Sequence, residues 1–168
     1  DNDMTALYSG FSTDIGAAGR SMSLANVSAT VAYAKGKNFG SQVYIVQHPF
    51  AVWDIANTAV TASATYPVPH GWSEDLLGNF FSGLRPINGV PIFEDGNISI
   101  DSSDDAIGVC CDKTALAVLK SVDTRTERQR DASLRAFEVV MTSDYGVFEL
   151  DDSKGVALTL DAATPATS

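Results

Sequence analysis

Residues 43–55 read Val-Tyr-Ile-Val-Gln-His-Pro-Phe-Ala-Val-Trp-Asp-Ile, a run in which a strand pattern gives way to a helix pattern. The β-branched and aromatic residues within 42–47 predict a short buried strand. His48 and Pro49 end that strand, because a proline has no N–H to donate to a sheet. The first turn of a helix tolerates a missing N–H, so a helix is predicted from Pro49 through Ile55.

The segment before this run predicts the end of one helix and the whole of another. Residues 1–8 have the composition of a helix tail, and the glycines that follow them break the helical pattern. Ser23 is a typical helix N-cap, and apolar residues recur at helical spacing from Leu24 to about Lys35. Gly36 then provides a stop signal. We therefore expect two helices, separated by a loop, ahead of the strand.

The segment after the run alternates loops with short elements. Residues 57–71 are rich in Thr, Ala and Pro and predict a long surface loop, or a segment that is ordered only by its neighbours. The strand predicted within 87–93 is expected at a sheet edge, because Pro91 cannot donate to an inner ladder. The other expected elements are a helix over 73–81, an acidic loop over 95–105, a strand over 107–111 and a helix from Asp112 through Val118.

The last third of the chain has the strongest strand character. Its predicted strands cover 120–128, 134–142, 145–150 and 156–160. A polar link at 127–131 separates the first two, and the polar residues 151–155 predict a turn before the last. Because helices and strands interleave without regular β-α-β units, the sequence predicts an α+β fold.

The composition indicates a folded protein that does not bind nucleic acid through its charge. Of the 168 residues, 45% are hydrophobic and 19% are charged, which is enough apolar material for a packed interior. Lys and Arg total 11 against 21 Asp and Glu, so the net charge is -10. Such a chain repels phosphate. No apolar run approaches the ~18 residues that a membrane-spanning helix requires.

Neither the cysteines nor the histidines form a recognisable catalytic or metal motif. Cys110 and Cys111 are adjacent, so on a strand they would point to opposite faces, and we expect both to be apolar fillers. A zinc site needs further ligands, and the only histidines are His48 and His70. His48 lies at a strand end but has no Gly-x-Ser-x-Gly nucleophile to serve. We expect no catalytic residues, no metal and no cofactor, and keep a small enzyme using His48 as an alternative.

The acidic loop resembles a calcium loop only in part. Residues 95–101 place oxygen-bearing side chains at alternate positions, as calcium ligands would be. Ile100 stands where such a loop needs glycine, and Ala106 stands where it needs a bidentate glutamate. An exposed acidic loop is therefore the prediction.

Basic residues are concentrated in one stretch of this acidic chain. Six of the 11 lie between Lys113 and Arg135, where they alternate with acidic residues. Two interpretations remain open: a solvated surface, or a contact surface of mixed sign for another subunit that carries excess acid.

Three stretches together resemble the major capsid proteins of tailed bacteriophages. Residues 3–12 resemble the end of the long spine helix of that family, and 43–55 are similar to its strand, His-Pro and helix segment. Residues 130–150 resemble the strands of its peripheral domain, and 88–93 match the strand that precedes an acidic loop. The resemblance covers nearly the whole chain in the family's order.

The resemblance implies a Hong Kong 97-like capsid fold with two domains. Residues 1–22 would hold the end of the spine helix in the peripheral domain, and 23–119 would form the axial domain. Residues 120–168 would supply the peripheral-domain strands and the C-terminal tail. The N-terminal arm, the extended loop and most of the spine helix would precede Asp1.

The function implied by the resemblance is structural. Copies of the chain would assemble into hexamers and pentamers of an icosahedral head shell that encloses double-stranded DNA without sequence-specific binding. The protein would be found in the virion, and in the host cytoplasm during assembly, with no membrane contact. Scaffolding, portal and decoration proteins are candidate partners. An encapsulin, which is a shell of the same fold around a protein cargo, is the main alternative.

The resemblance also suggests which residues lie between subunits. Exposed ion pairs contribute only ~0–1 kcal/mol each, but a closed shell repeats each contact many times. An apolar loop around Trp72 is costly to leave in water, so it is expected to be buried between subunits. The expected interface residues are Trp72, Lys120, Arg125, Glu127, Arg128, Arg130, Asp131 and Arg135.

Overall fold

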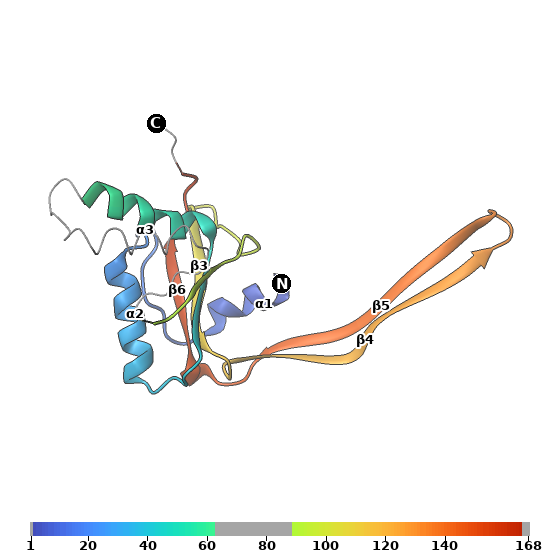
Figure 1. Cartoon of the computed structure of the whole chain (residues 1–168), viewed down its shortest axis with the longest axis horizontal. Coiled ribbons are helices and arrows are strands. Elements are labelled where there is room, and N and C mark those ends of the chain that lie inside the picture. The colour runs from blue at the N-terminus through green and yellow to red at the C-terminus, as the bar shows by residue number, and fades with distance from the viewer. Residues whose placement is uncertain (1, 63–88, 166–168) are drawn as a thin grey trace.

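The computed structural model describes residues 2–62 and 89–165, which form a small body and a long projecting hairpin (Figure 1). Its helices are α1 (Asn2–Thr5), η1 (Ala6–Gly10), α2 (Leu24–Gly36), α3 (Pro49–Ala62) and η2 (Asp152–Lys154). Its strands are β1 (Val43–Gln47), β2 (Ile92–Glu94), β3 (Asp105–Asp112), β4 (Leu116–Asp131), β5 (Ala136–Glu149) and β6 (Gly155–Asp161). No helix among the described residues is long and apolar enough to cross a membrane.

A four-stranded mixed sheet forms the centre of the body, in the order β2-β1-β3-β6. β1 pairs parallel to β2 and antiparallel to β3, and β3 pairs antiparallel to β6. β2 lies at the edge, as the proline before it predicts, and the carbonyl oxygen of Pro91 accepts a 3.1 Å hydrogen bond from the Ile45 N–H. The α+β class is confirmed.

The core lies where α2 and α3 pack beside this sheet (Figure 1). Ile45 of β1 and Val52 of α3 are completely buried, and Ile55 is nearly so. The helix spacing of the apolar residues in 49–55 places Val52 and Ile55 on the same face of α3, which is the face that the sheet covers. Burying each such aliphatic side chain contributes roughly 1.5–3 kcal/mol.

The sequence signals for α2 are confirmed at both ends. The side chain of Ser23 accepts a 3.2 Å hydrogen bond from the Asn26 N–H, so this serine is the N-cap. The helix ends at Gly36, and Asn38 follows with a positive φ of 54°. Val27, Val31 and Ala34 are its buried apolar positions, as the helical spacing indicates.

Of the two elements predicted next after Ile55, the loop needs correction in its first part and the helix lies outside the described residues. The predicted loop over 57–71 is wrong for its first six residues, because α3 continues to Ala62. Alanines at 56, 59 and 62 favour propagation of a helix that has already been nucleated. The rest of that loop and the predicted helix over 73–81 lie outside the described residues.

The predicted helix from Asp112 through Val118 is wrong. Asp112 is the last residue of β3, and β4 begins at Leu116. The Asp112 carboxylate does accept local hydrogen bonds, from the N–H (3.3 Å) and the hydroxyl (2.7 Å) of Thr114, but they shape a tight turn and not a helix start. An Asp side chain bonds to the backbone two residues ahead equally well in an Asx turn and at a helix N-terminus, so this signal is ambiguous in sequence.

The strands of the last third are longer than predicted. The link expected at 127–131 is part of β4, and the turn lies at 132–135 instead. The predicted strands over 134–142 and 145–150 are one strand, β5. The predicted domain boundaries at 22/23 and 119/120 stay a prediction. β6 belongs to the predicted segment 120–168, and it lies in the same sheet as β1 and β3 of the segment 23–119.

Candidate functional site: the projecting hairpin

β4 and β5 form a two-stranded antiparallel hairpin that extends far from the body (Figure 1). Near the body the register runs from Leu116 opposite Glu149 to Lys120 opposite Tyr145. Between Lys120 and Arg125 the register shifts twice, and each shift inserts one extra residue into β4. Such bulges bend and twist a ladder. The hairpin therefore has an inner and an outer part, joined by an irregular section of β4.

The outer end is closed by a turn that the sequence builds locally. One carboxylate oxygen of Asp131 accepts hydrogen bonds from the Ser133 hydroxyl (2.6 Å), the Ser133 N–H (2.8 Å) and the Leu134 N–H (3.3 Å). These bonds, the hydroxyl first, hold the pKa of Asp131 below its ordinary value. Arg135 completes the turn with a φ of 51°, in the left-handed region.

The register of the outer part sorts its side chains onto two faces. Opposed residues of an antiparallel pair point to the same side, and neighbours along a strand point to opposite sides. One face, called here the arginine face, carries Thr126, Arg128, Arg130, Phe137, Val139 and Met141. The other, called here the carboxylate face, carries Arg125, Glu127, Gln129, Asp131, Ala136, Glu138, Val140 and Thr142.

The arginine face combines an apolar stripe with unpaired cations. Phe137, Val139 and Met141 follow one another at every second position of β5, with 58%, 59% and 69% of their surface exposed. The guanidinium of Arg128 lies over the Phe137 ring, 3.8 Å from its centroid. A cation in this position is attracted by the ring and shields part of the stripe from water.

The base of the hairpin is tied to α1 and closed by a hydrogen bond between its own two sides. The Tyr145 hydroxyl donates a 2.8 Å hydrogen bond to the Asp3 carboxylate, which raises the pKa of Tyr145. The Leu150 N–H donates a 2.8 Å hydrogen bond to the carbonyl oxygen of Ala115. These contacts fix the point where the hairpin leaves the body.

His48, the candidate catalytic base, makes contacts that cap α3. Its Nδ1 accepts a 3.2 Å hydrogen bond from the Phe50 N–H, and its own N–H donates a 3.0 Å bond to the side-chain oxygen of Gln47. The side-chain nitrogen of Gln47 donates a 3.2 Å bond to the Leu158 carbonyl oxygen. Burial holds the pKa of His48 below its ordinary 6.5, although the Asp95 carboxylate acts in the opposite direction. These bonds explain the histidine as an N-terminal cap that joins α3 to the sheet.

We expect mild acid to destabilise the protein through His48. Because its pKa is lower in the folded chain than in the unfolded one, the unfolded state binds the proton more tightly. The free energy of unfolding should therefore fall as the pH drops from about 7.5 to about 5, and be fully restored above the unfolded pKa. Urea unfolding of the protein and its His48→Asn variant, which keeps a capping acceptor, should show a difference that depends on pH. If the free energy of unfolding still falls with decreasing pH in His48→Asn, and no longer does so in His70→Asn, His48 is not the group responsible.

The cysteines and the acidic loop are held in local structure. Burial raises the pKa of Cys110 to about 12 and that of Cys111 to about 11, so both thiols stay protonated at neutral pH and are poor nucleophiles. In the acidic loop, Asp95 accepts bonds from the Asn97 N–H and side chain (both 2.9 Å), and Asp101 accepts from the Ser103 N–H (2.7 Å). Within the described ranges no His, Cys, Asp and Glu side chains form a group able to hold a metal ion.

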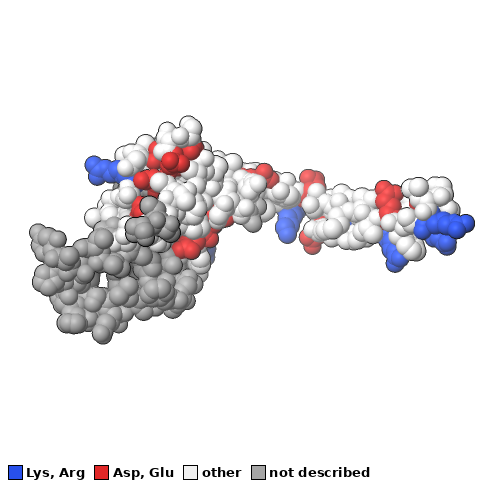
Figure 2. Space-filling model, turned by 90° about the horizontal axis from the view of Figure 1, so that it is seen from above, with Lys and Arg blue, Asp and Glu red and all other residues white. Residues whose placement is uncertain are grey.

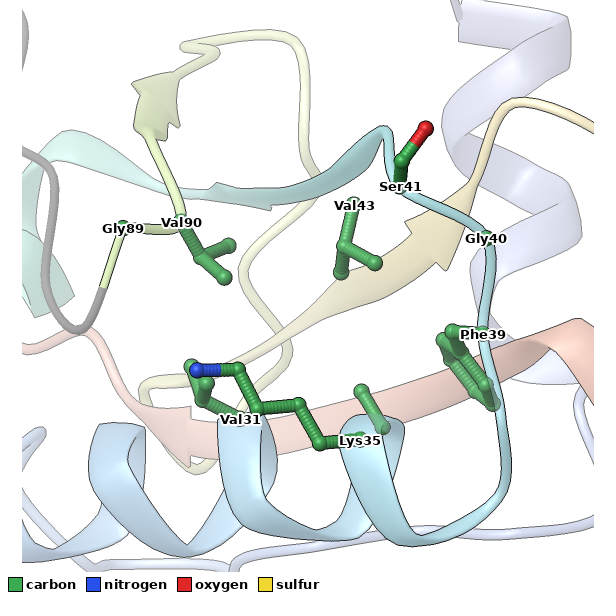
Figure 3. A pocket seen from close by; sticks show the side chains of 9 residues that line it. Val31, Lys35, Phe39, Gly40, Ser41, Val43, Gly89 and Val90 are labelled. Atoms are coloured by element: carbon green, nitrogen blue, oxygen red, sulfur yellow. The ribbon is translucent and has the colours of Figure 1, made fainter.

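A pocket of about 290 Å³ opens between α2 and β1 (Figure 3). Val31, Phe39, Val43 and Val90 contribute apolar walls, and Lys35 is the charged residue among those that line it. Ser41 also lines it, and no histidine or carboxylate is among the described lining residues to activate that hydroxyl. The arrangement offers no nucleophile–base pair.

Comparison with known proteins identifies the architecture. No protein-family profile matches the chain, and no curated protein matches its sequence. A chain in the head structure of Helicobacter pylori bacteriophage KHP40 superposes with a TM-score of 0.67, over 96% of this chain and 64% of its own length, at 12% identity. The capsid of cyanophage P-SCSP1u superposes with a TM-score of 0.61 over 96% and 60%, at 13% identity. The chain has the Hong Kong 97 capsid fold.

The likeness extends to a shell of another kind. The holo-SrpI encapsulin complex of Synechococcus elongatus PCC 7942 has a TM-score of 0.61, over 92% of this chain and 55% of its own, at 11% identity. The present chain spans about three fifths of the length of the phage capsid chains described above. The Hong Kong 97 fold is thus shown over nearly all of this chain, at low sequence identity.

Within this Hong Kong 97 fold, the structure gathers most of the predicted interface residues on the arm. Lys120 pairs with Asp123 at 3.9 Å in the irregular section, and both side chains are exposed. Arg125, Glu127, Arg128, Arg130, Asp131 and Arg135 all lie in the outer part. Trp72 lies outside the described residues. The interface role of all eight residues stays a prediction.

Sequence reasoning missed the apolar stripe of the arginine face. Part of its signal was present, because Phe137, Val139 and Met141 recur at a period of two, but the apolar Val140 between the last two obscures the alternation. The stripe became meaningful only with the register, which places it on the same face as Arg128 and Arg130.

Proposed function

We propose that this chain is a shell subunit of a tailed-phage head and that copies of it assemble around double-stranded DNA. The observation that carries the proposal is the fold, which matches chains of phage heads over 96% of this chain. The projecting hairpin supports it, since a long two-stranded arm with an exposed apolar stripe is marginally stable alone and gains by packing against another copy.

The charge of the chain also fits a container. A net charge of -10 repels the phosphates of packaged DNA, so the DNA would be enclosed without a sequence-specific grip. In this proposal the chain forms hexamers and pentamers of an icosahedral shell and has no catalytic role. It acts in the virion after assembly in the host cytoplasm, with scaffolding, portal and decoration proteins as partners.

Negative-stain electron microscopy of the native protein that contains this chain, in physiological salt, tests the proposal. We expect uniform closed shells tens of nanometres across. Nuclease-protected double-stranded DNA inside the purified shells would identify a phage head. Small monodisperse particles from the intact native protein would contradict a shell function.

An encapsulin is the second candidate, because the SrpI encapsulin complex matches the fold about as well as one of the phage capsids does. Shells that hold an enzyme and no DNA would favour it. An enzyme that uses His48 is the third alternative. It requires a catalytic activity of the monomer that His48→Ala abolishes, whereas the capping contacts of this residue predict only a loss of stability.

A further inference from the structure

We propose that residues 12–20, called here the strap, cover the outer edge of β6 and keep it from pairing with β6 of a second copy, and that the carboxylate of Asp14 holds this cover closed. Both the strap and β6 lie among the described residues. Such a cover acts whether or not copies of the chain form a shell, so it goes beyond the proposed function.

β6 has an edge on which another strand could pair. It is the last strand in the order β2-β1-β3-β6, so β3 is its partner on one side only. The N–H groups of Ala157, Thr159 and Asp161 point away from β3, at every second position of the strand. A row of such groups at the edge of a sheet is a template for a strand of another chain.

The backbone of the strap occupies this edge near both of its ends. The Ala157 N–H donates a 2.8 Å hydrogen bond to the carbonyl oxygen of Thr13, and the Ala157 carbonyl oxygen accepts a 2.9 Å bond from the Ile15 N–H. These two bonds form a parallel bridge. Farther along β6, the Asp161 N–H donates a 2.9 Å bond to the carbonyl oxygen of Arg20. The strap therefore supplies a strand-like partner for the first and the third of the three N–H groups.

At the second N–H group, a side chain takes the place of the backbone. One carboxylate oxygen of Asp14 accepts a 3.1 Å hydrogen bond from the Thr159 N–H, and the other accepts a 2.7 Å bond from the Thr159 hydroxyl. Asp14 thus satisfies both donors of the residue in the middle of the edge. Hydrogen bonds to an ionised group are stronger than those between neutral groups. The loss of this carboxylate is consequently the most direct way to open the edge.

The strap fits closely against β6 beyond Asp14. A Cβ at Gly16 would clash with the carbonyl oxygen of Thr159, and Gly16 has a φ of 127°, which glycine adopts without strain. Nearer its end, the Gly19 N–H donates a 2.6 Å hydrogen bond to the buried carboxylate of Asp105. These contacts hold the strap against the sheet on both sides of Thr159.

The sequence of β6 makes a second copy of the same strand the fitting partner. β6 reads Gly-Val-Ala-Leu-Thr-Leu-Asp, without proline or a basic residue, and Asp161 at its end is its only charge. Exposed edge strands are usually protected from pairing by proline, lysine or other charges. Short segments with high β-propensity, little charge and no proline pair with identical segments of other chains. Two uncovered β6 edges that run antiparallel would form a closed two-fold pair.

The charge of the body opposes such pairing but does not replace the cover. Figure 2 shows acidic side chains spread over the body and basic ones gathered at the far end of the arm. The net charge of -10 makes two copies repel each other, but salt screens this repulsion beyond about 8 Å at physiological ionic strength. A variant that removes a carboxylate therefore needs a control that loses the same charge elsewhere.

Hydrogen exchange of the purified native protein, read by fragmentation mass spectrometry, tests the role of Asp14. In Asp14→Ala the Thr159 amide loses its acceptor, so we expect it to exchange at least about tenfold faster. The Leu158 amide faces β3 and should keep its rate. Asp14→Asn retains a carbonyl oxygen for the Thr159 N–H and should exchange within about threefold of the unaltered protein. An unchanged Thr159 rate in Asp14→Ala would overturn the role given to this carboxylate.

Sedimentation velocity of the full-length subunits, before they assemble, tests the pairing of two copies. At a fixed concentration we expect Asp14→Ala to raise the fraction of dimer at least about tenfold. The matched control is Asp144→Ala, which removes the same charge from an exposed position of β5 and should behave as the unaltered protein. Adding Thr159→Lys to Asp14→Ala places a cation on the edge and should return the dimer to the level of the control. Asp14 is exposed, so circular dichroism should show unchanged folding.

Two outcomes would overturn the pairing through β6. One is a dimer fraction in Asp14→Ala that is no higher than in Asp144→Ala. The other is a dimer that persists when Thr159→Lys is added, because the contact would then lie elsewhere. Shell formation is a readout of neither experiment, so a failure of the proposed function would leave both results unchanged.

Discussion

The Gly108→Val substitution is expected to lower the free energy of unfolding by about 3–5 kcal/mol. Gly108 lies in β3, and a Cβ at this position would be 2.5 Å from the carbonyl oxygen of Val46, with the side-chain oxygen of Gln47 equally close by. Neither atom can yield easily. Val46 belongs to the paired strand β1, and Gln47 is completely buried with both ends of its side chain hydrogen-bonded.

Equilibrium unfolding in urea measures this effect. The matched control is Gly96→Val, in an exposed loop where an added Cβ has no neighbour within 4 Å and φ is not in the left-handed region. That control should change the free energy of unfolding by no more than about 0.5–1 kcal/mol. Equal losses in the two variants would show that the tight contact between β3 and β1 is not what excludes a side chain from position 108.

Gln47→Ala is expected to cost about 2–4 kcal/mol. The side chain of Gln47 satisfies the N–H of His48, which follows β1, and the carbonyl oxygen of Leu158, which lies within β6 and is far away in sequence. Removing it leaves two backbone groups without these partners in a fully buried site, and also leaves a cavity. The loss should appear as a lower urea midpoint with an unchanged m-value.

Gln129→Ala is the control for this second prediction. Gln129 is exposed on the outer part of the hairpin, so the same chemical change there should alter the free energy of unfolding by less than about 0.5 kcal/mol. If Gln47→Ala proves equally mild, ordered water replaces both hydrogen bonds, and the glutamine is not the link between β1 and β6. Gln47 contacts the space beside Gly108, so the two large effects should not add when combined.

The sequence predicted the elements whose signals are local. The run 43–55 predicts β1 and the start of α3, because a β-branched cluster, a proline and helical spacing all lie within it. Ser23 and Gly36 mark the ends of α2 for the same reason. The α+β class and the resemblance to capsid folds followed from the order of such segments, and the structure comparison agrees.

The sequence did not predict features that depend on distant partners. Asp112 has the same local bonding in a turn as at a helix start, and only the pairing of β3 with β1 and β6 decides between them. The polar residues 127–131 have a turn-like composition, yet they remain in a strand because β5 pairs with each of them. A charged segment with its side chains in water can be strand or loop, and the partner strand determines which.

For the candidate site, the sequence predicted the residues but not the face of the hairpin on which each one lies. The concentration of arginines was visible in the composition of 113–135, and most of the predicted interface residues do lie on one arm. Their division between two faces depends on the register. That register includes two irregularities in β4 which no local pattern marks.

The two irregularities change the direction of the arm without exchanging its two faces. Side chains alternate with a period of two along a strand, so a single inserted residue in β4 would turn every later side chain over relative to the inner part. Two insertions bring the alternation back into phase, and even-numbered residues of β4 occupy the same face before and after the bend. The arm can therefore be bent, straightened or lengthened in steps of two residues without exchanging its faces, whereas any odd step inverts the outer half. The number of residues inserted into β4 must therefore be even if the outer part is to keep its two faces on the same sides as the inner part.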